Sequence, residues 1–195
     1  MALVVFLRGV NVGRHKRFLP AQLAKDLAAL DIVNVGAAGT FVVRASLSQG
    51  ALLAEMRMRL AFDADIVIVK GRELIEFAGS APFGRRPPAA SEQRFLSVML
   101  ARPRVVPPLP SMYPANDRWQ VKVVAVSGKF AASVWRRQPG TPIYPNAALE
   151  KQFGVSTTRN WNTVETVLQI LQPRVAPSLG SDPGTGTSLG SDPNQ

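Results

Sequence analysis

The opening stretch Ala2-Leu3-Val4-Val5-Phe6-Leu7-Arg8-Gly9-Val10-Asn11-Val12-Gly13 decides the fold of the first half, because it runs from an apolar segment into a glycine-containing loop. A continuous apolar run of this length is typical of a buried strand. Leucines then recur at helical spacing after the loop, at Leu19, Leu23, Leu27 and Leu30. Pro20 suits the first position of a helix, where its missing N–H costs nothing. The stretch therefore predicts a strand, a loop and a helix in succession.

The next elements extend this unit to residue 70. Residues 32–35 and 41–44 are short β-branched runs on either side of Gly36-Ala37-Ala38-Gly39, which predicts a hairpin. Apolar residues at helical spacing follow in 46–60, and 65–69 is again strand-like. The order β-α-β-β-α-β is that of the split-βαβ or ferredoxin-like arrangement. We therefore expect a first ferredoxin-like subdomain over residues 1–70, with both helices on one face of an antiparallel sheet.

The second half has a similar but incomplete pattern. Residues 71–93 are interpreted as a connector with a short helix, and 94–172 as a second α+β subdomain. Here a strand at 95–100 precedes a segment with five prolines, a hairpin centred on Ser127-Gly128-Lys129, and helices at 146–153 and 160–171. The order β-x-β-β-α-α suggests a degenerate copy of the first half, with a Pro-rich loop in place of its first helix. The predicted fold class is α+β, with two ferredoxin-like subdomains and helices on one face of each antiparallel sheet.

Residues 173–195 differ from the rest of the chain in composition. The hexapeptide Ser-Leu-Gly-Ser-Asp-Pro occurs at 178–183 and again at 188–193, within a segment rich in Gly, Ser and Pro. Such a composition buries too little apolar surface to fold by itself. A flexible extension is expected.

The charge balance favours anionic partners. The chain has 23 Lys and Arg against 13 Asp and Glu, a formal net charge of +10. An excess of this size attracts phosphate-bearing molecules and raises non-specific affinity for nucleic acid. Net charge alone affects how fast partners associate and how soluble the protein is, so it does not define a site. The expected partners are an anionic small molecule or nucleic acid.

Residue counts exclude several kinds of site. The chain has no cysteine and a single histidine, His15. Disulfides, thiolate catalysis, cysteine-ligated metals and the usual Ser-His-Asp triad are therefore excluded. The carboxylates Asp63 and Asp65 lie beside a strand start and are interpreted as turn residues rather than a catalytic pair. We expect neither a metal nor a cofactor.

The sequence also bears on location. The N-terminus enters a strand-like pattern without the three regions of a signal peptide. No apolar stretch approaches the ~20 residues that span a bilayer. A cytoplasmic protein without a membrane partner is expected.

The first candidate ligand-binding set lies in the glycine-containing loop. Its members can present backbone N–H groups, an amide and guanidinium forks to a phosphate or carboxylate: Arg8, Gly9, Asn11, Gly13, Arg14, Lys16 and Arg17. The loop is not a P-loop, because three residues separate its glycines and no Ser or Thr follows Lys16. The alternative is a wide turn with solvated cations.

The second candidate set is Arg159, Asn160, Trp161 and Asn162, within Thr157-Thr158-Arg159-Asn160-Trp161-Asn162-Thr163. The stretch opens the last predicted helix. Its structural interpretation is a helix cap with a tryptophan anchored in the core. A guanidinium and two amides beside an indole are more polar functionality than a cap requires, which favours a binding role.

Both motif blocks resemble the hallmarks of the domain of unknown function 1697 family. The first is Phe6-Leu7-Arg8-Gly9-Val10-Asn11-Val12-Gly13 and the second is Thr157-Thr158-Arg159-Asn160-Trp161-Asn162-Thr163-Val164. The resemblance spans about residues 2–171. It implies an intracellular, mostly bacterial α+β protein of two ferredoxin-like subdomains, and it brings no established activity, substrate or catalytic residue.

The chain departs from this family in two places. Ala37-Ala38-Gly39-Thr40 stands where the family usually has Gln-Ser-Gly-Asn, and residues 138–144 replace a polar stretch that contains tyrosine and glycine. If these segments belong to a site, the protein binds something different or has lost that function.

Three functions stay open at this point. The leading hypothesis is a non-catalytic binding module for an anionic, phosphate-bearing ligand, with nucleic acid as one such ligand. The second is an enzyme acting on a phosphorylated metabolite or nucleotide, with Arg8, Asn11 and Arg159 orienting the substrate. The third is a structural or oligomer-forming protein, and the sequence leaves the oligomeric state open. The deciding structural question is whether residues 8–13 and 158–162 line one cleft.

Overall fold

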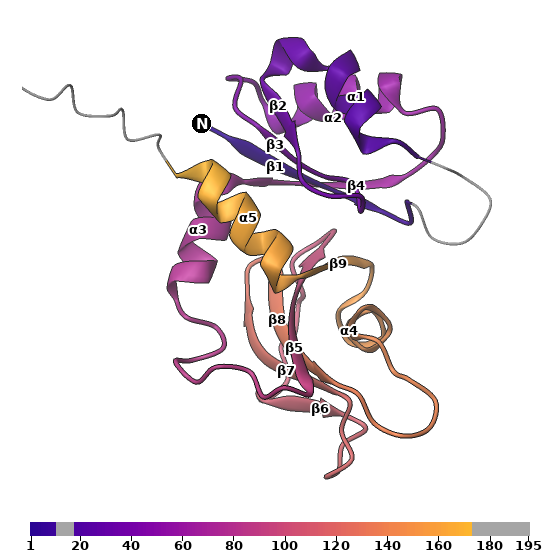
Figure 1. Cartoon of the computed structure of the whole chain (residues 1–195), viewed down its shortest axis with the longest axis vertical. Helices are drawn as coiled ribbons and strands as arrows, with labels where there is room; N and C mark the ends of the chain where they lie inside the picture. The colour runs from indigo at the N-terminus through magenta and orange to yellow at the C-terminus, as the bar shows by residue number, and fades with distance from the viewer. Residues whose placement is uncertain (11–17, 173–195) are drawn as a thin grey trace, which may run out of the picture.

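The structure is a computed structural model that describes residues 1–10 and 18–172 (Figure 1). The described part contains a four-stranded and a five-stranded antiparallel sheet, with helices outside and between them. The predicted α+β class is confirmed. None of the helices in the described ranges is long and apolar enough to cross a membrane.

The four-stranded sheet comes from the first half of the chain and has the order β2-β3-β1-β4. Its strands are β1 (Leu3–Arg8), β2 (Ile32–Asn34), β3 (Thr40–Val43) and β4 (Asp65–Lys70). All neighbouring strands pair antiparallel. The helices between them are α1 (Pro20–Asp26), a single 3-10 turn (Ala28–Leu30) and α2 (Gln49–Arg59). This is the β-α-β-β-α-β order predicted from the sequence.

Alternation along β1 gives the four-stranded sheet two buried faces. Leu3, Val5 and Leu7 point to the face covered by α1 and α2, where they pack with Leu23 and Met56. Val4 and Phe6 point to the opposite face, toward the second sheet. Since side chains alternate along a strand, an unbroken apolar run is what a sheet buried on both faces requires.

The five-stranded sheet has the order β6-β7-β8-β5-β9. Its strands are β5 (Glu92–Met99), β6 (Ser111–Tyr113), β7 (Val121–Ser127), β8 (Phe130–Arg136) and β9 (Ser156–Asn160). Helix α4 (Pro145–Phe153) packs on its outer face through Ala148 and Leu149, which contact Met99 and Val121.

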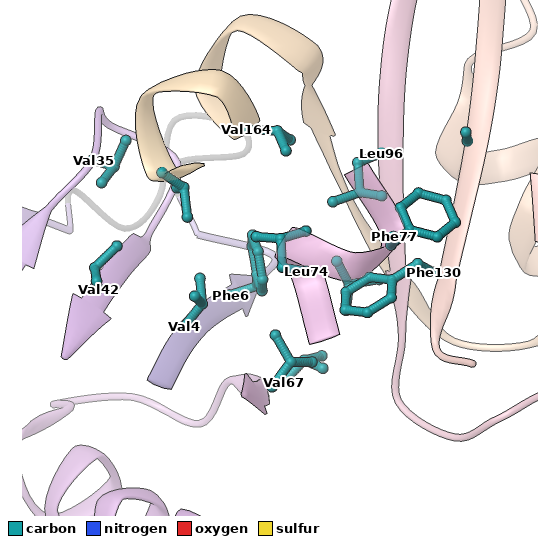
Figure 2. Close-up of a cluster of buried hydrophobic side chains, with 14 residues drawn as sticks. Val4, Phe6, Val35, Val42, Val67, Leu74, Phe77, Leu96, Phe130 and Val164 are labelled. Atoms are coloured by element: carbon teal, nitrogen blue, oxygen red, sulfur yellow. The ribbon is translucent and has the colours of Figure 1, made fainter. Parts of the chain in front are cut away.

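Two helices lie between the sheets, α3 (Gly71–Gly79) and α5 (Trp161–Leu171). Figure 2 shows the apolar cluster that they form, in which Leu74 and Val164 lie with Phe6 and Leu96 from the two sheets. Helix α5 therefore covers the face of the five-stranded sheet opposite α4. As predicted, α1 and α2 share one face of the first sheet. The prediction of helices on one face only is wrong for both sheets, because α3 and α5 are buried between them.

Two strands were not predicted. β6 is a three-residue strand inside the Pro-rich segment, and β9 is the polar stretch interpreted as a helix cap. β9 pairs with β5 over Phe95–Met99, and α5 begins directly after it at Trp161. The second half thus reads β-x-β-β-α-β-α rather than β-x-β-β-α-α.

With β9 in place, the two sheets share a strand order. The order β7-β8-β5-β9 repeats β2-β3-β1-β4, and all pairs are antiparallel in both. Equivalent hydrogen bonds lie near the ends of β1 and β5, from Leu7 N to Gly39 O and from Met99 N to Lys129 O, both at 2.8 Å. The Pro-rich segment occupies the place of the first helix.

Candidate functional site: a cleft between the sheets

A cleft of about 500 Å³ lies where the end of β1 meets β9 and the start of α4. We call it the Arg159 cleft; its lining includes Leu7, Arg8, Gly9, Val10, Ala38, Phe95, Tyr144, Pro145, Asn146, Glu150, Ser156, Thr157, Thr158 and Arg159. The first motif block contributes residues 7–10, and the second contributes residues 157–159. Two blocks about 150 positions apart in the chain therefore meet at one cleft.

Arg8 links the first sheet to α4 at the edge of this cleft. It ends β1 directly opposite Asp65 on β4. Its Nη1 donates to Asp65 Oδ2 at 3.0 Å, and its Nε and Nη2 both lie 3.0 Å from Glu150 Oε1. The hydrogen bond to Glu150 raises the pKa of Arg8, so its guanidinium stays charged at any physiological pH. Both carboxylates offset this charge.

Arg159 bridges the two sheets from inside the cleft wall. Its guanidinium donates five hydrogen bonds of 2.6–2.9 Å, to Thr40 Oγ1, Thr157 Oγ1, Thr158 O, Leu7 O and Ala38 O. These acceptors lie on β3, β9, β1 and the turn between β2 and β3. Because a guanidinium has five N–H donors, these bonds use all of them.

The charge of Arg159 has no counter-charge among the described residues. The side chain is buried, with 6% of its surface exposed, and no ion pair in the described ranges includes it. Burial lowers the pKa of Arg159 to about 10. A buried cation without a carboxylate is costly even when it is fully hydrogen-bonded. The cleft wall therefore holds a desolvated positive charge.

The start of α4 adds further positive potential to the cleft. Tyr144 is the N-cap residue and makes no side-chain capping bond, and Pro145 follows at the first helical position. Asn146 lies next and lines the cleft. The first backbone N–H groups of a helix have no intrahelical acceptor, and they carry the positive end of the helix dipole.

A buried hydroxyl without a partner lines the same cleft. Ser156 is 1% exposed, and its Oγ makes no hydrogen bond within the described part of the chain. Two residues further along β9, Thr158 Oγ1 lies 2.7 Å from Ser97 Oγ. An unpaired buried hydroxyl costs free energy unless something else satisfies it. Ser156 thus brings an unsatisfied buried hydroxyl to the lining of the cleft.

The other three residues of the second candidate set do not line the Arg159 cleft. Asn160, Trp161 and Asn162 line a separate pocket of about 320 Å³. Asn160 caps α5 by accepting from Asn162 N at 2.9 Å. Trp161 packs edge-on against Phe83, with 4.8 Å between ring centroids. In this part of the motif the contacts are those of a helix cap and a core anchor.

Asn11, Gly13, Arg14, Lys16 and Arg17 lie outside the described residues. Their predicted role in ligand binding stays a prediction. Within residues 1–10 and 18–172, no group of three or more acidic or histidine side chains is placed to hold a metal ion.

Sequence reasoning missed several residues of the site, including Thr40, Asp65 and Glu150. Asp65 carried a usable signal: in the predicted sheet β1 and β4 are antiparallel neighbours, which sets Arg8 opposite the first residue of β4. Thr40 and Glu150 carried none, because their contacts with Arg159 and Arg8 span 119 and 142 residues.

The two sheets repeat one strand order, but only one of them has an arginine at the position of Arg159. Arg159 pairs with Leu96 on β5, one residue before the N-cap of α5. In the first half, Val69 pairs with Val4 on β1, one residue before the N-cap of α3. An arginine therefore stands where the other half has a buried valine.

Comparison with known proteins shows which family the chain belongs to. The sequence profile of the family described as "Protein of unknown function (DUF1697)" matches residues 1–126, well over half of the chain. The chain belongs to this family. The first motif block falls inside the matched range and the second lies beyond it.

A solved structure supports the fold of this DUF1697 member. Conserved bacterial protein SP0830 from Streptococcus pneumoniae matches with a TM-score of 0.52 and 13% identity, over 88% of this chain and 98% of that one. At this identity the likeness concerns the fold alone. A search of curated proteins finds no match.

Proposed function

We propose that this protein is a binding module for a small phosphate-bearing ligand, and that the Arg159 cleft is its site. The observation that carries the proposal is the buried guanidinium of Arg159, which lines the cleft without a carboxylate partner in the described ranges. An anion in the cleft supplies the missing counter-charge.

Arg159 acts on such a ligand through its charge rather than through a hydrogen bond, because its five donors are already used. Charges attract more strongly near a low-dielectric wall than in open water. The direct donors to the ligand are the first N–H groups of α4 and the Ser156 hydroxyl, which line the same cleft. Helix N-termini are favourable places for phosphate.

Arg8 has a different part in this proposal. Its contacts with Asp65 and Glu150 use three of its five N–H donors within the described residues. The two carboxylates repel an anion on their side of the guanidinium. The phosphate group is therefore expected at the end formed by Ser156 and Asn146, with Arg8 contacting it from the rim.

A thermal-shift panel tests the proposal. Phosphometabolites, mononucleotides and oligonucleotides are compared at low and high salt, since a ligand of the folded state raises its melting temperature. A saturable rise with one class of small phosphate compound is expected. The absence of any shift across the panel would exclude this function.

Nucleic acid is the second candidate, favoured by the net charge of +10. Its affinity depends on counterion release and falls steeply with salt, whereas a compact site for one phosphate group depends on salt far less. A shift with oligonucleotides alone, lost at high salt, would assign the function to this candidate.

A further inference from the structure

The second sheet has a cleft at the place equivalent to the Arg159 cleft. It is about 430 Å³ in volume. It is lined by Arg102 past β5, the turn between β7 and β8, the strand β4 and Gln49 of α2, and also by α3, whose counterpart α5 does not line the Arg159 cleft. The Arg159 cleft lies just past β1, beside the turn between β2 and β3, the strand β9 and the start of α4. We call the second one the Lys129 cleft, from the residue in its hairpin turn.

The walls of the Lys129 cleft carry three cationic side chains, Lys70, Arg102 and Lys129. None of them forms an ion pair within the described residues. Two carboxylates also line the cleft. Glu73 Oε2 accepts a hydrogen bond from Lys70 N at 3.3 Å, which places it at the start of α3, and Glu76 lies one turn further along that helix. The formal charge of the lining is positive.

Apolar residues also line the Lys129 cleft. Phe77 and Phe130 are among them, with ring centroids 5.3 Å apart, and Val69 on β4 is a third; all three side chains are buried. By strand register, Phe130 and Val69 occupy the places that Thr40 and Arg159 hold in the other half. The repeat has therefore produced two clefts with different chemistry.

We propose that the Lys129 cleft is a second binding site, which takes a phosphomonoester with an apolar body. Lysine is a common phosphate ligand that acts as a point charge, and Lys70 and Lys129 supply two such charges. The volume matches that of small-molecule sites, which pair an apolar lining with a few charged groups. This site stands apart from the proposed function, because the two clefts share no lining residue.

Phenyl phosphate is the simplest probe of this site, with inorganic phosphate and phenol as its two halves. Binding to the full chain is followed by amide chemical shifts in a ¹⁵N–¹H spectrum. The proposal predicts shifts at Gly128 and Lys129 that saturate at lower concentration with phenyl phosphate than with phosphate, and none with phenol. Shifts at Ala38 and Gly39 report the Arg159 cleft separately.

Two variants complete the test. Lys129→Ala is expected to weaken phenyl phosphate binding about tenfold, the typical loss of one charge-assisted contact. Lys25→Ala, an exposed lysine on α1, is the matched control and is expected to leave it unchanged. Unperturbed Gly128 and Lys129 amides at saturating probe, or equal binding by the Lys129→Ala variant, would overturn the proposal.

Discussion

At the scale of single residues, Arg159 is the side chain on which most of the site depends. It is a buried cation that ties β9 to the end of β1 and to the turn before β3, through neutral oxygen atoms alone. Such an arrangement is stable only if every donor is satisfied, because a buried unpaired N–H or C=O costs about 1–3 kcal/mol. The same residue therefore holds the sheets together and charges the cleft.

Replacing Arg159 by Ala is expected to lower the free energy of unfolding by about 3 kcal/mol or more. The change removes the Arg159 donor from the carbonyl of Ala38 and leaves that of Leu7 with only the Thr157 hydroxyl. Urea denaturation measures this. Arg44→Ala is the control, since Arg44 makes a partly exposed 3.7 Å ion pair with Asp31 and is expected to cost less than about 1 kcal/mol. Equal losses in the two variants would contradict the role given to Arg159.

The pH dependence of stability follows from the lowered pKa of Arg159. The pKa of Arg159 is lowered to about 10 in the folded chain, so above about pH 10 the unfolded chain, whose arginine keeps its ordinary higher pKa, binds more protons. Stability from this group is therefore expected to rise with pH above about 10. Urea denaturation of the wild type and Arg159→Gln from pH 7 to 11 isolates the effect. The difference in the free energy of unfolding between the two proteins is expected to stay constant up to pH 9 and then to shift in favour of the wild type. A difference that is constant over the whole range would contradict the lowered pKa of Arg159.

At the scale of elements, the sequence predicted the apolar strands and missed the polar one. β1 and β4 are apolar runs, and the leucine spacing of α1 and the hairpin at Gly128 were equally readable. β9 could not be predicted, because Ser156–Asn160 has the composition of a cap and owes its strand form to pairing with β5. For the same reason, the sequence pattern placed Thr157, Thr158 and Arg159 at the start of a helix rather than on a strand that lines the cleft.

The junction between β4 and α3 gives a prediction at this scale. A Cβ on Gly71 would lie 2.7 Å from Leu171 Cδ2 and 3.2 Å from Ala2 O, so Gly71→Ala is expected to destabilise the fold by about 1–3 kcal/mol. Gly79→Ala at the other end of α3 has open space and is expected to be neutral or slightly stabilising. Thermal denaturation of both variants compares them. A Gly71→Ala variant as stable as the wild type would show that α5 does not pack here.

At the scale of the whole molecule, two halves with one strand order enclose a common core. The cluster in Figure 2 contains residues of both sheets and of the two helices that follow β4 and β9. Contacts outside this core also join the halves, among them the hydrogen bonds of Arg159 and the ion pair of Arg8 with Glu150. The repeat explains why there are two related clefts, and the residues at the Thr40/Phe130 and Arg159/Val69 positions are two of their differences.

A double-mutant cycle on Arg8 and Glu150 measures the link between the halves. The pair is partly exposed, with 37% and 29% of the side-chain surfaces accessible, so a coupling free energy of about 0.5–1 kcal/mol is expected. Arg8→Ala, Glu150→Ala and the double variant are compared by urea denaturation. Coupling of the same size between Arg8 and Glu55, which lies on α2 and pairs with Arg59, would show that the effect is not local.

The most direct test of the proposed site compares two buried serines. Ser156 and Ser133 both have an unpartnered buried Oγ among the described residues, but only Ser156 lines the Arg159 cleft. Each Ser→Ala change is expected to leave the free energy of unfolding within about 1 kcal/mol, because it removes an unsatisfied group. Calorimetric titration is done with the phosphate compound that gives the largest thermal shift. The account predicts affinity about tenfold weaker in Ser156→Ala and unchanged in Ser133→Ala; equal affinities in the two variants would contradict it.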